Sequence, residues 1–211
     1  FLETLEMPIY KIASGDLKNI PLIKYIATFN KPIIVSTGGA KIEDVQRVYD
    51  EIMPINQNLA LLQCTAAYPA RTEDLNLRVI ESYRELFPDI VIGYSGHDNG
   101  IAMPIVAYMV GARVIEKHFT LDRTMKGTDQ VFSLAPHAMK HMVRDLRRAK
   151  NALGDPVKRC LEVEEAPLIK MGKKLVAAKA LPKGHLLNAD DIAIKSPGDG
   201  LAPHQINDVI G

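Results

Sequence analysis

Short apolar runs alternate along the chain with segments in which apolar residues recur every three or four positions. The runs are bounded by Pro, Gly or Asn and are apolar almost throughout, as in strands that are covered on both faces. The five predicted strands are residues 9–13, 33–36, 59–64, 90–94 and 114–118. The five predicted helices are residues 20–28, 42–52, 75–86, 100–110 and 138–153. This alternation predicts a parallel sheet in an α/β fold.

The placement of polar residues distinguishes between the two common parallel-sheet architectures. A doubly wound sheet concentrates its chemistry at one glycine-rich turn and a switch point, whereas a barrel collects it from many strand ends. Every predicted strand here ends in polar or reactive groups, which include Lys11, Ser36, Cys64, Ser95 and Glu116. We therefore expect part of a (β/α)8 TIM barrel. Because a complete barrel needs eight strands and typically about 250 residues, either its first strands are missing or the barrel is not closed.

The pattern changes after Gly154, a residue type that commonly ends a helix. Residues 154–170 are charged and irregular, which is typical of a linker. Residues 171–211 combine short alternating runs with Pro-Gly and Asp-Gly turn signals, and they predict a small β-rich domain that stops without a closing element. Residues 1–153 would then be the C-terminal part of the barrel domain.

Composition excludes several classes of partner. The chain has 211 residues, a formal net charge of +1, no Trp and 6% aromatic residues, so neither nucleic acid nor an acidic membrane surface is an expected partner. No apolar run approaches the roughly 20 residues that span a bilayer. The two cysteines, Cys64 and Cys160, have no metal-ligand or redox spacing. We expect a cytoplasmic protein with Cys64 as a small buried residue.

Two histidines follow consecutive predicted strands. His97 lies just past one strand and His118 ends the next, where it shares a strand face with Glu116. Adjacent parallel strands are about 4.8 Å apart, so both imidazoles could reach one divalent cation such as Mn²⁺ or Zn²⁺. The alternative, that each histidine is a lone hydrogen-bonded residue, is weaker for two at neighbouring strand ends.

An anion pocket is expected beside these histidines. Its candidate donors are Lys11, Ser14, Ser36 and Ser95. Donors that arrive from several strands favour phosphate over carboxylate. No P-loop or GxGxxG motif is present, so a nucleotide is not indicated. Taken one at a time, each of these serines is more often a turn or cap residue than a ligand-binding one.

Five segments carry a resemblance to the sialic acid synthase family, in the order and spacing of that family. They are Tyr10-Lys11-Ile12-Ala13-Ser14-Gly15-Asp16, Ser36-Thr37-Gly38, Gln63-Cys64-Thr65-Ala66-Ala67-Tyr68-Pro69, Gly93-Tyr94-Ser95-Gly96-His97 and Glu116-Lys117-His118-Phe119-Thr120-Leu121-Asp122. The C-terminal segment also resembles the antifreeze-like (SAF) domain that follows the barrel in this family.

The resemblance implies an enzyme that condenses phosphoenolpyruvate with N-acetylmannosamine or its 6-phosphate, giving N-acetylneuraminic acid or its 9-phosphate and phosphate. It implies a divalent metal, Mn²⁺ or Mg²⁺, on His97 and His118, with Glu116 beside the reacting carbons. By the same resemblance, Lys11, Ser14, Ser36 and Ser95 would bind phosphoenolpyruvate, and Asp16, Tyr68 and Asp129 would face the sugar. It further implies a homodimer with a swapped C-terminal domain.

The chain departs from the family in three places. Ala66 replaces an Asn of some bacterial members, and Ser196 replaces an Arg that reaches the sugar from the partner subunit. The first barrel strands, which carry a further phosphoenolpyruvate lysine, are absent, so we expect this fragment to be inactive alone. Two alternatives stay open. One is a synthase for a related acid (pseudaminic, legionaminic or deaminated), and the other is a non-catalytic sugar-binding protein.

Overall fold

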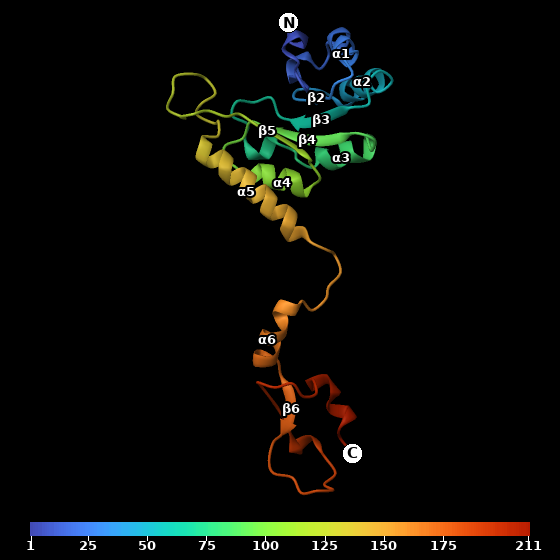
Figure 1. Cartoon of the computed structure of the whole chain (residues 1–211), viewed down its shortest axis with the longest axis vertical. Helices are drawn as coiled ribbons and strands as arrows, with labels where there is room; N and C mark the ends of the chain where they lie inside the picture. The colour runs from blue at the N-terminus through green and yellow to red at the C-terminus, as the bar shows by residue number, and fades with distance from the viewer. The chain divides into compact units, whose positions relative to one another are not determined.

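The computed structural model describes residues 1–211, which form two compact units. The first unit is Phe1–Gly154 and the second is Asp155–Gly211. Each unit has a sheet of its own (Figure 1).

The first unit is built on a five-stranded parallel sheet whose strands lie in chain order. The strands are β1 (Tyr10–Ile12), β2 (Ile33–Ser36), β3 (Leu59–Cys64), β4 (Val91–Gly96) and β5 (Val114–Lys117). A doubly wound sheet reverses its strand order at a switch point, and this sheet does not. Five successive strand–helix units therefore form half of a barrel, which confirms the predicted fold class.

A helix follows each of the five strands. The helices are α1 (Ile20–Ala27), α2 (Ile42–Ile52), α3 (Val79–Leu86), α4 (Ala102–Met109) and α5 (Pro136–Leu153). Local signals set their ends: the Asn19 side chain accepts a hydrogen bond from the first turn of α1, and Gly154 ends α5 with a φ of 52°. No helix in the structure combines the length and the apolar character that crossing a membrane requires.

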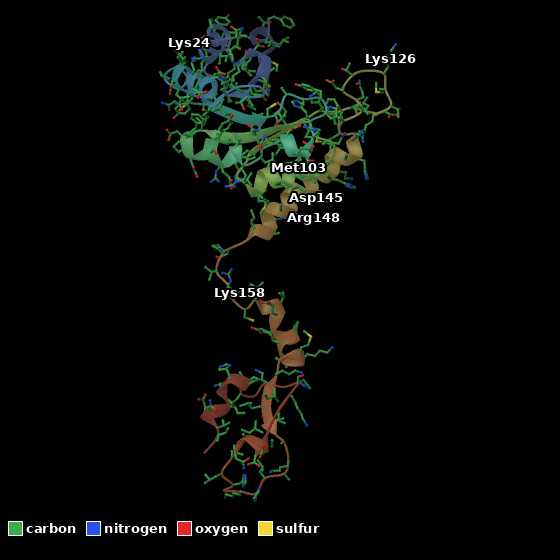
Figure 2. All side chains as sticks on the ribbon, turned by 180° about the vertical axis from the view of Figure 1, so that it is seen from behind. Lys24, Met103, Lys126, Asp145, Arg148 and Lys158 are labelled. Atoms are coloured by element: carbon green, nitrogen blue, oxygen red, sulfur yellow. The ribbon has the colours of Figure 1, made fainter.

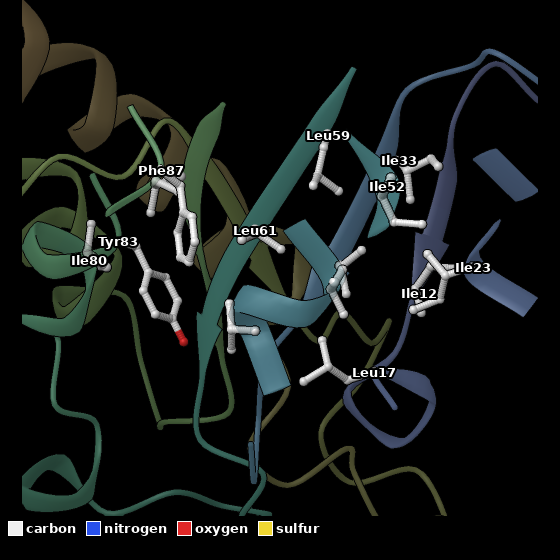
Figure 3. Close-up of a cluster of buried hydrophobic side chains, with 14 of the residues drawn as sticks. Ile12, Leu17, Ile23, Ile33, Ile52, Leu59, Leu61, Ile80, Tyr83 and Phe87 are labelled. Atoms are coloured by element: carbon white, nitrogen blue, oxygen red, sulfur yellow. The ribbon is translucent and has the colours of Figure 1, made fainter. Parts of the chain in front are cut away.

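The hydrophobic core lies between the strands and the helices that cover one face of the sheet (Figure 3). Alternate strand residues supply one side of it, for example Leu59 and Leu61 on β3, because successive side chains of a strand point to opposite faces. Apolar positions of the helices, such as Ile23, Ile52 and Ile80, supply the other side. The second face of each strand is thereby left free to carry the polar residues at its carboxyl end.

One helix begins later than its apolar pattern predicts. Residues 75–86 were expected to be helical, but α3 begins at Val79. Asn76 has a φ of 46°, in the left-handed region that interrupts a helix. Leu75 is 1% exposed, so its side chain is buried like that of a helix residue although it lies in the segment before α3. This burial explains why the apolar pattern includes it.

The second unit contains a two-stranded antiparallel sheet of β6 (Lys174–Ala177) and β7 (Ile192–Lys195). The loop that joins the two strands is held by the Asp191 carboxylate. Its oxygens lie 2.7 Å from Lys179 Nζ and 2.7 Å from His185 Nε2, and it accepts the backbone N–H of Asn188. The predicted β-rich C-terminal module is confirmed.

The segment expected to be an irregular linker contains a helix, α6 (Glu162–Met171). Its first turn carries Glu162, Glu164 and Glu165, which the positive end of the helix dipole favours. The Glu164 carboxylate also accepts the backbone N–H of Leu161 at 2.7 Å. Pro167 lies inside the helix, where the sequence pattern indicated a break. Only residues 154–161 connect α5, the last helix of the first unit, to α6.

Candidate active site

Polar side chains from all five strands lie on the sheet face opposite the core, toward the carboxyl ends of the strands. In the strand register, Cys64 is paired with Ser95, and Ser95 with Glu116. Residues paired in this way point to the same side of a sheet, and so do residues two apart along a strand. The strand residues that share this face are Lys11, Ser36, Cys64, Ser95 and Glu116. The sheet itself therefore brings the predicted residues together.

His97 and His118 continue β4 and β5 on that same face. Their ring centroids are 5.1 Å apart, and the ring planes are inclined by 72°. His97 is 6% exposed, whereas about a third of the His118 side chain is exposed. Two imidazoles at this separation can direct one nitrogen each toward a common point.

The orientation of the His97 ring is set by its hydrogen bonds. Its Nδ1 lies 2.8 Å from the carbonyl oxygen of Thr65, which can only accept, so Nδ1 carries a proton and the lone pair of the neutral ring is on Nε2. The Cys64 Sγ is 3.9 Å from the same nitrogen. Burial lowers the pKa of His97, but the contacts with Cys64 and Thr65 outweigh burial and raise that pKa overall.

His118 has the opposite pKa shift. Burial lowers the pKa of His118, and the proximity of His97 lowers it further, against a weaker opposing effect of Asp129. The Asp129 Oδ2 lies 3.6 Å from His118 Nδ1. A lowered pKa keeps the His118 imidazole neutral, which is the form that binds metals.

Glu116 lies between the histidines and the cationic end of the site. Its Oε1 accepts a hydrogen bond from Ser95 Oγ at 2.7 Å, and its Oε2 is 3.6 Å from Lys11 Nζ. Glu116 is therefore held as an acceptor on the same face as both imidazoles.

Two of the three serines of the predicted anion pocket, Ser14 and Ser36, differ in their partners. Ser14 Oγ accepts the backbone N–H of Gly38 at 2.9 Å and is 3.5 Å from Cys64 Sγ. A Cβ added at Gly38 would lie 2.8 Å from Ser14 Oγ and 3.0 Å from Cys64 Sγ, so only glycine fits there. Ser36 is 2% exposed, and its Oγ has no hydrogen-bond partner. An unpaired buried hydroxyl is unusual and suggests a ligand oxygen as its partner.

Aromatic rings form one wall of the site. The Tyr68 ring centroid is 4.2 Å from that of His97 and 5.9 Å from that of His118, and Tyr68 is 54% exposed. Phe132 is 2% exposed and its ring centroid is 5.1 Å from that of His118. A half-exposed ring beside two imidazoles offers a surface on which a sugar could stack.

Asp16 does not join this cluster. It lies on the short 3-10 helix Ser14–Asp16, its side chain is exposed, and it makes no hydrogen bond or ion pair with another side chain. The other nine predicted site residues are linked through the contacts and the register described above.

The polar loop after β5 extends from the site toward solvent, with Lys126 at its far end (Figure 2). The Arg123 guanidinium donates to the carbonyl of Val131 across the loop. Asp122 accepts hydrogen bonds from the backbone and the hydroxyl of Thr124, both at 2.8 Å. These contacts give the loop internal structure although its residues 121–128 are exposed.

The donor set is compatible with a divalent cation in an open coordination sphere. His97 and His118 could each offer one imidazole nitrogen, and the fixed tautomer of His97 is the one a metal ligand requires. The structure contains no group of three or more His, Cys, Asp or Glu side chains arranged to hold a metal. The remaining coordination positions would therefore belong to water and substrate oxygens.

Three contributors to the site were missed in the sequence. Cys64 is buried as expected, yet it contacts both Ser14 and His97. The Thr65 carbonyl is a backbone group, which no residue-type pattern reveals. Phe132 follows a polar loop and looks like an ordinary core residue. For Cys64, its position at a strand end among other polar groups was the available signal.

The comparisons with known proteins agree with this geometry. A model of the NeuB family matches residues 1–158, and a model of the SAF domain matches residues 174–211. The chain belongs to the NeuB family. It is 42% identical to the human N-acetylneuraminate-9-phosphate synthase and 35% identical to the N,N'-diacetyllegionaminic acid synthase of Campylobacter jejuni, in both cases over all of this chain. The resemblance to sialic acid synthases is thereby confirmed.

A solved structure supports the fold of the NeuB-family chain. The sialic acid synthetase of Leptospira borgpetersenii aligns with a TM-score of 0.72 and 31% identity, covering 79% of this chain and 58% of that one. The chain spans 59% of the length of the human relative and 64% of the Campylobacter relative.

Proposed function

We propose that the protein containing this chain condenses phosphoenolpyruvate with N-acetylmannosamine or its 6-phosphate. The products would be phosphate and N-acetylneuraminic acid or its 9-phosphate. The observation that carries the proposal is the common strand face on which Lys11, Ser36 and Glu116 lie beside the two histidines. A small polyanion and an aldehyde would meet there.

The anion end of the site suits phosphoenolpyruvate. Lys11 supplies a cation, and hydroxyl groups come from Ser14, on the 3-10 helix after β1, and from Ser36, at the end of β2. The buried Ser36 Oγ has no protein partner, so it could donate a hydrogen bond to a phosphate or carboxylate oxygen. Lys11 is already near Glu116, so binding the anion would bring the reacting carbons close to that carboxylate.

The part of the site around His97 and His118 suits the aldehyde group of the sugar. When held by His97 and His118, Mn²⁺ or Mg²⁺ would polarise the aldehyde oxygen of the acceptor. Tyr68 and Asp129 flank the histidines and would orient the sugar, and Asp16, two residues beyond Ser14, would contact its far end.

Glu116 is the proposed proton acceptor. The new bond joins C3 of phosphoenolpyruvate to the aldehyde carbon and leaves C2 electron-poor. Water then attacks C2 and passes one proton to the Glu116 carboxylate, which returns it to the alkoxide left by the aldehyde oxygen. The tetrahedral intermediate collapses to the 2-keto group as the C–O bond to phosphate breaks, and the remaining hydroxyl proton leaves with phosphate. Ser95, which donates to Glu116 at 2.7 Å, would keep the carboxylate turned toward that water.

The proposal also concerns which sugar is the acceptor and whether that sugar is phosphorylated. The human relative, at 42% identity, is named for a 9-phosphate product, which favours the 6-phosphate of N-acetylmannosamine as acceptor. The Campylobacter relative, at 35% identity, is named for a legionaminic acid, and a related acceptor is the alternative.

The test is an assay of phosphate release by the full-length protein. Phosphoenolpyruvate is supplied with N-acetylmannosamine, with its 6-phosphate or with related six-carbon sugars, each with and without EDTA. We expect release that EDTA abolishes and that Mn²⁺ restores, and a loss of at least about 100-fold in His97→Ala. His204→Ala, at an exposed histidine of the second unit, is the matched control. Activity that survives both EDTA and His97→Ala would overturn the metal assignment, and no release with any sugar would favour a non-catalytic sugar-binding protein.

We further propose that the protein is a homodimer. Apolar side chains on the loops at the site are exposed: Phe119 by 53%, Leu121 by 73%, Met125 by 51% and Val131 by 60%. Such a patch is typical of an interface, and the family resemblance suggests the partner's C-terminal domain as its cover. Light scattering of the full-length protein would show twice the subunit mass, and a monomer would contradict the proposal.

A further inference from the structure

A buried ion pair lies on the other face of β4 and β5, away from the catalytic residues. Lys117 Nζ is 2.9 Å from Asp98 Oδ1, and the two side chains are 1% and 2% exposed. Lys117 Nζ also donates to the backbone carbonyl of Asp98, and the Tyr94 hydroxyl donates to Asp98 Oδ1 at 2.7 Å. Two hydrogen bonds from Lys117 therefore connect the end of β5 to the turn that follows β4, and the third ties that turn to Tyr94 of β4.

The ion pair is adjacent in sequence to both histidines. Asp98 directly follows His97, and Lys117 directly precedes His118. In the strand register Lys117 is paired with Gly96, so successive residues alternate between the two faces. The ion pair therefore links the two backbone segments that carry the imidazoles.

Gly96 makes room for this link. A Cβ at Gly96 would lie 2.5 Å from Tyr94 Cε1 and 2.8 Å from Asp98 Oδ1. The absence of a side chain allows the tyrosine ring and the carboxylate to approach each other behind the strand. Asp98 can therefore occupy its position in the ion pair because Gly96 has no side chain.

Stability alone is a poor explanation for a pair buried in this way. Removing two charges from water costs free energy that their attraction often fails to recover, and apolar replacements are frequently as stable. Here Asp98 Oδ2 is buried and has no hydrogen-bond partner, so the carboxylate is incompletely satisfied. The pair does fix the distance between the end of β5 and the turn that follows β4.

We propose that Asp98 and Lys117 are positioning residues that hold His97 and His118 at the spacing needed to share one divalent cation. The inference rests on the proposed function only in assuming that these histidines bind a metal. The ring separation of 5.1 Å is the quantity that the ion pair maintains.

The test measures Mn²⁺ binding without substrates, so that it does not depend on activity. The double variant Asp98→Asn/Lys117→Met removes both charges together and leaves no unpaired ion. In the full-length protein, electron paramagnetic resonance of free Mn²⁺ should show binding weakened by about tenfold or more, by analogy with the loss of groups that orient metal ligands. Excess Mn²⁺ should restore most of the activity, which loss of a catalytic group would not permit.

The matched control is Lys24→Met/Glu51→Gln. It removes an ion pair of 2.8 Å whose side chains are 45% and 43% exposed and which is remote in sequence from both histidines. Its Mn²⁺ affinity should equal that of the wild type. If the buried double variant does not fold, Tyr94→Phe removes only the hydroxyl that holds Asp98 and should weaken Mn²⁺ binding severalfold.

The outcomes separate the two proposals. The positioning role would be overturned if the folded double variant bound Mn²⁺ with wild-type affinity. If the double variant does not fold, wild-type Mn²⁺ affinity in a folded Tyr94→Phe variant would overturn it. A wild-type protein that binds no Mn²⁺ but retains EDTA-insensitive synthase activity would instead overturn the metal in the proposed function and, with it, the basis of this inference.

Discussion

Two serines at the ends of neighbouring strand segments occupy very different chemical environments. Ser14 Oγ is already engaged with the Gly38 N–H and lies near Cys64, whereas Ser36 Oγ is buried without any partner. A buried polar group without a partner lowers stability, and native structures retain such groups where they serve a ligand. The two hydroxyls should therefore respond differently to removal.

Ser36→Ala should leave stability unchanged or raise it by up to about 1 kcal/mol, because it removes an unpaired buried hydroxyl. The same change should raise the KM for phosphoenolpyruvate by about tenfold or more, since a hydrogen bond to a charged group is lost. Thermal unfolding and steady-state kinetics of the full-length protein provide the two measurements.

Ser14→Ala is the comparison for that variant. It leaves the Gly38 N–H without its acceptor and should lower stability by about 1 kcal/mol in addition to weakening phosphoenolpyruvate binding. If Ser36→Ala destabilised the protein as much as Ser14→Ala did, Ser36 would have a structural partner and the anion role would lose its support.

At the scale of elements, the sequence predicted what depends on side-chain alternation and missed what depends on backbone conformation. The five strands were located from their apolar runs, and the shared face of Glu116 and His118 follows from the two-residue period of a strand. The start of α3 was misplaced because Asn76 adopts a left-handed φ that residue type does not dictate. Helix α6 was missed because Pro167 and a high charge density resemble a linker, although the acidic first turn favours a helix.

The same distinction applies to the candidate site. Residues on strands could be assigned to one face without a structure, and these form most of the cluster. Contacts that depend on tertiary placement could not be predicted from the sequence. Examples are the contact of the Thr65 carbonyl with His97 and that of the Phe132 ring with His118. The Asp98–Lys117 pair was equally hidden, because two charged residues near strand ends are ordinarily solvated.

The loop between β6 and β7 should be sensitive to acid through Asp191. Hydrogen bonds from Lys179, His185 and the Asn188 N–H hold the pKa of Asp191 far below its usual range. A carboxyl group whose pKa is lower in the folded state contributes stability above its unfolded pKa, near 3.9, and loses that contribution as pH falls. We therefore expect this loop to open as the pH decreases below about 4.

Hydrogen exchange of the backbone amides around Asn188 between pH 6 and pH 3 would measure this opening, after correction for intrinsic exchange. In Asp191→Asn the protection should already be lost at pH 6 and should change little on acidification. Asp190→Asn, at the exposed neighbouring residue, should retain the wild-type profile. An Asp191→Asn loop with wild-type protection at pH 6 would show that the carboxylate does not hold it.

At the scale of the whole molecule, the two units are connected by a short segment with no regular structure. Residues 155–161 are exposed throughout and lie between the end of α5 and the start of α6. Trypsin cleaves after Lys and Arg, so Lys158 and Arg159 provide two cleavage sites in this segment. Lys158 is labelled on it in Figure 2. Exposed segments outside helices and strands are the preferred sites of limited proteolysis.

Trypsin at low ratio should therefore cut the full-length protein first after Lys158 or Arg159. The fragment that carries the SAF domain would begin near Cys160, and mass spectrometry of the early products would identify it. Lys158→Gln/Arg159→Gln should slow this first cut by about tenfold or more, because the remaining sites lie in folded elements, in short turns, in the loop between β6 and β7 or in the loop after β5. Arg123 and Lys126 provide the competing sites, since that loop is also exposed. An initial cut there would mean that the loop, despite the Arg123 bond to the Val131 carbonyl, opens more readily than the connection between the units.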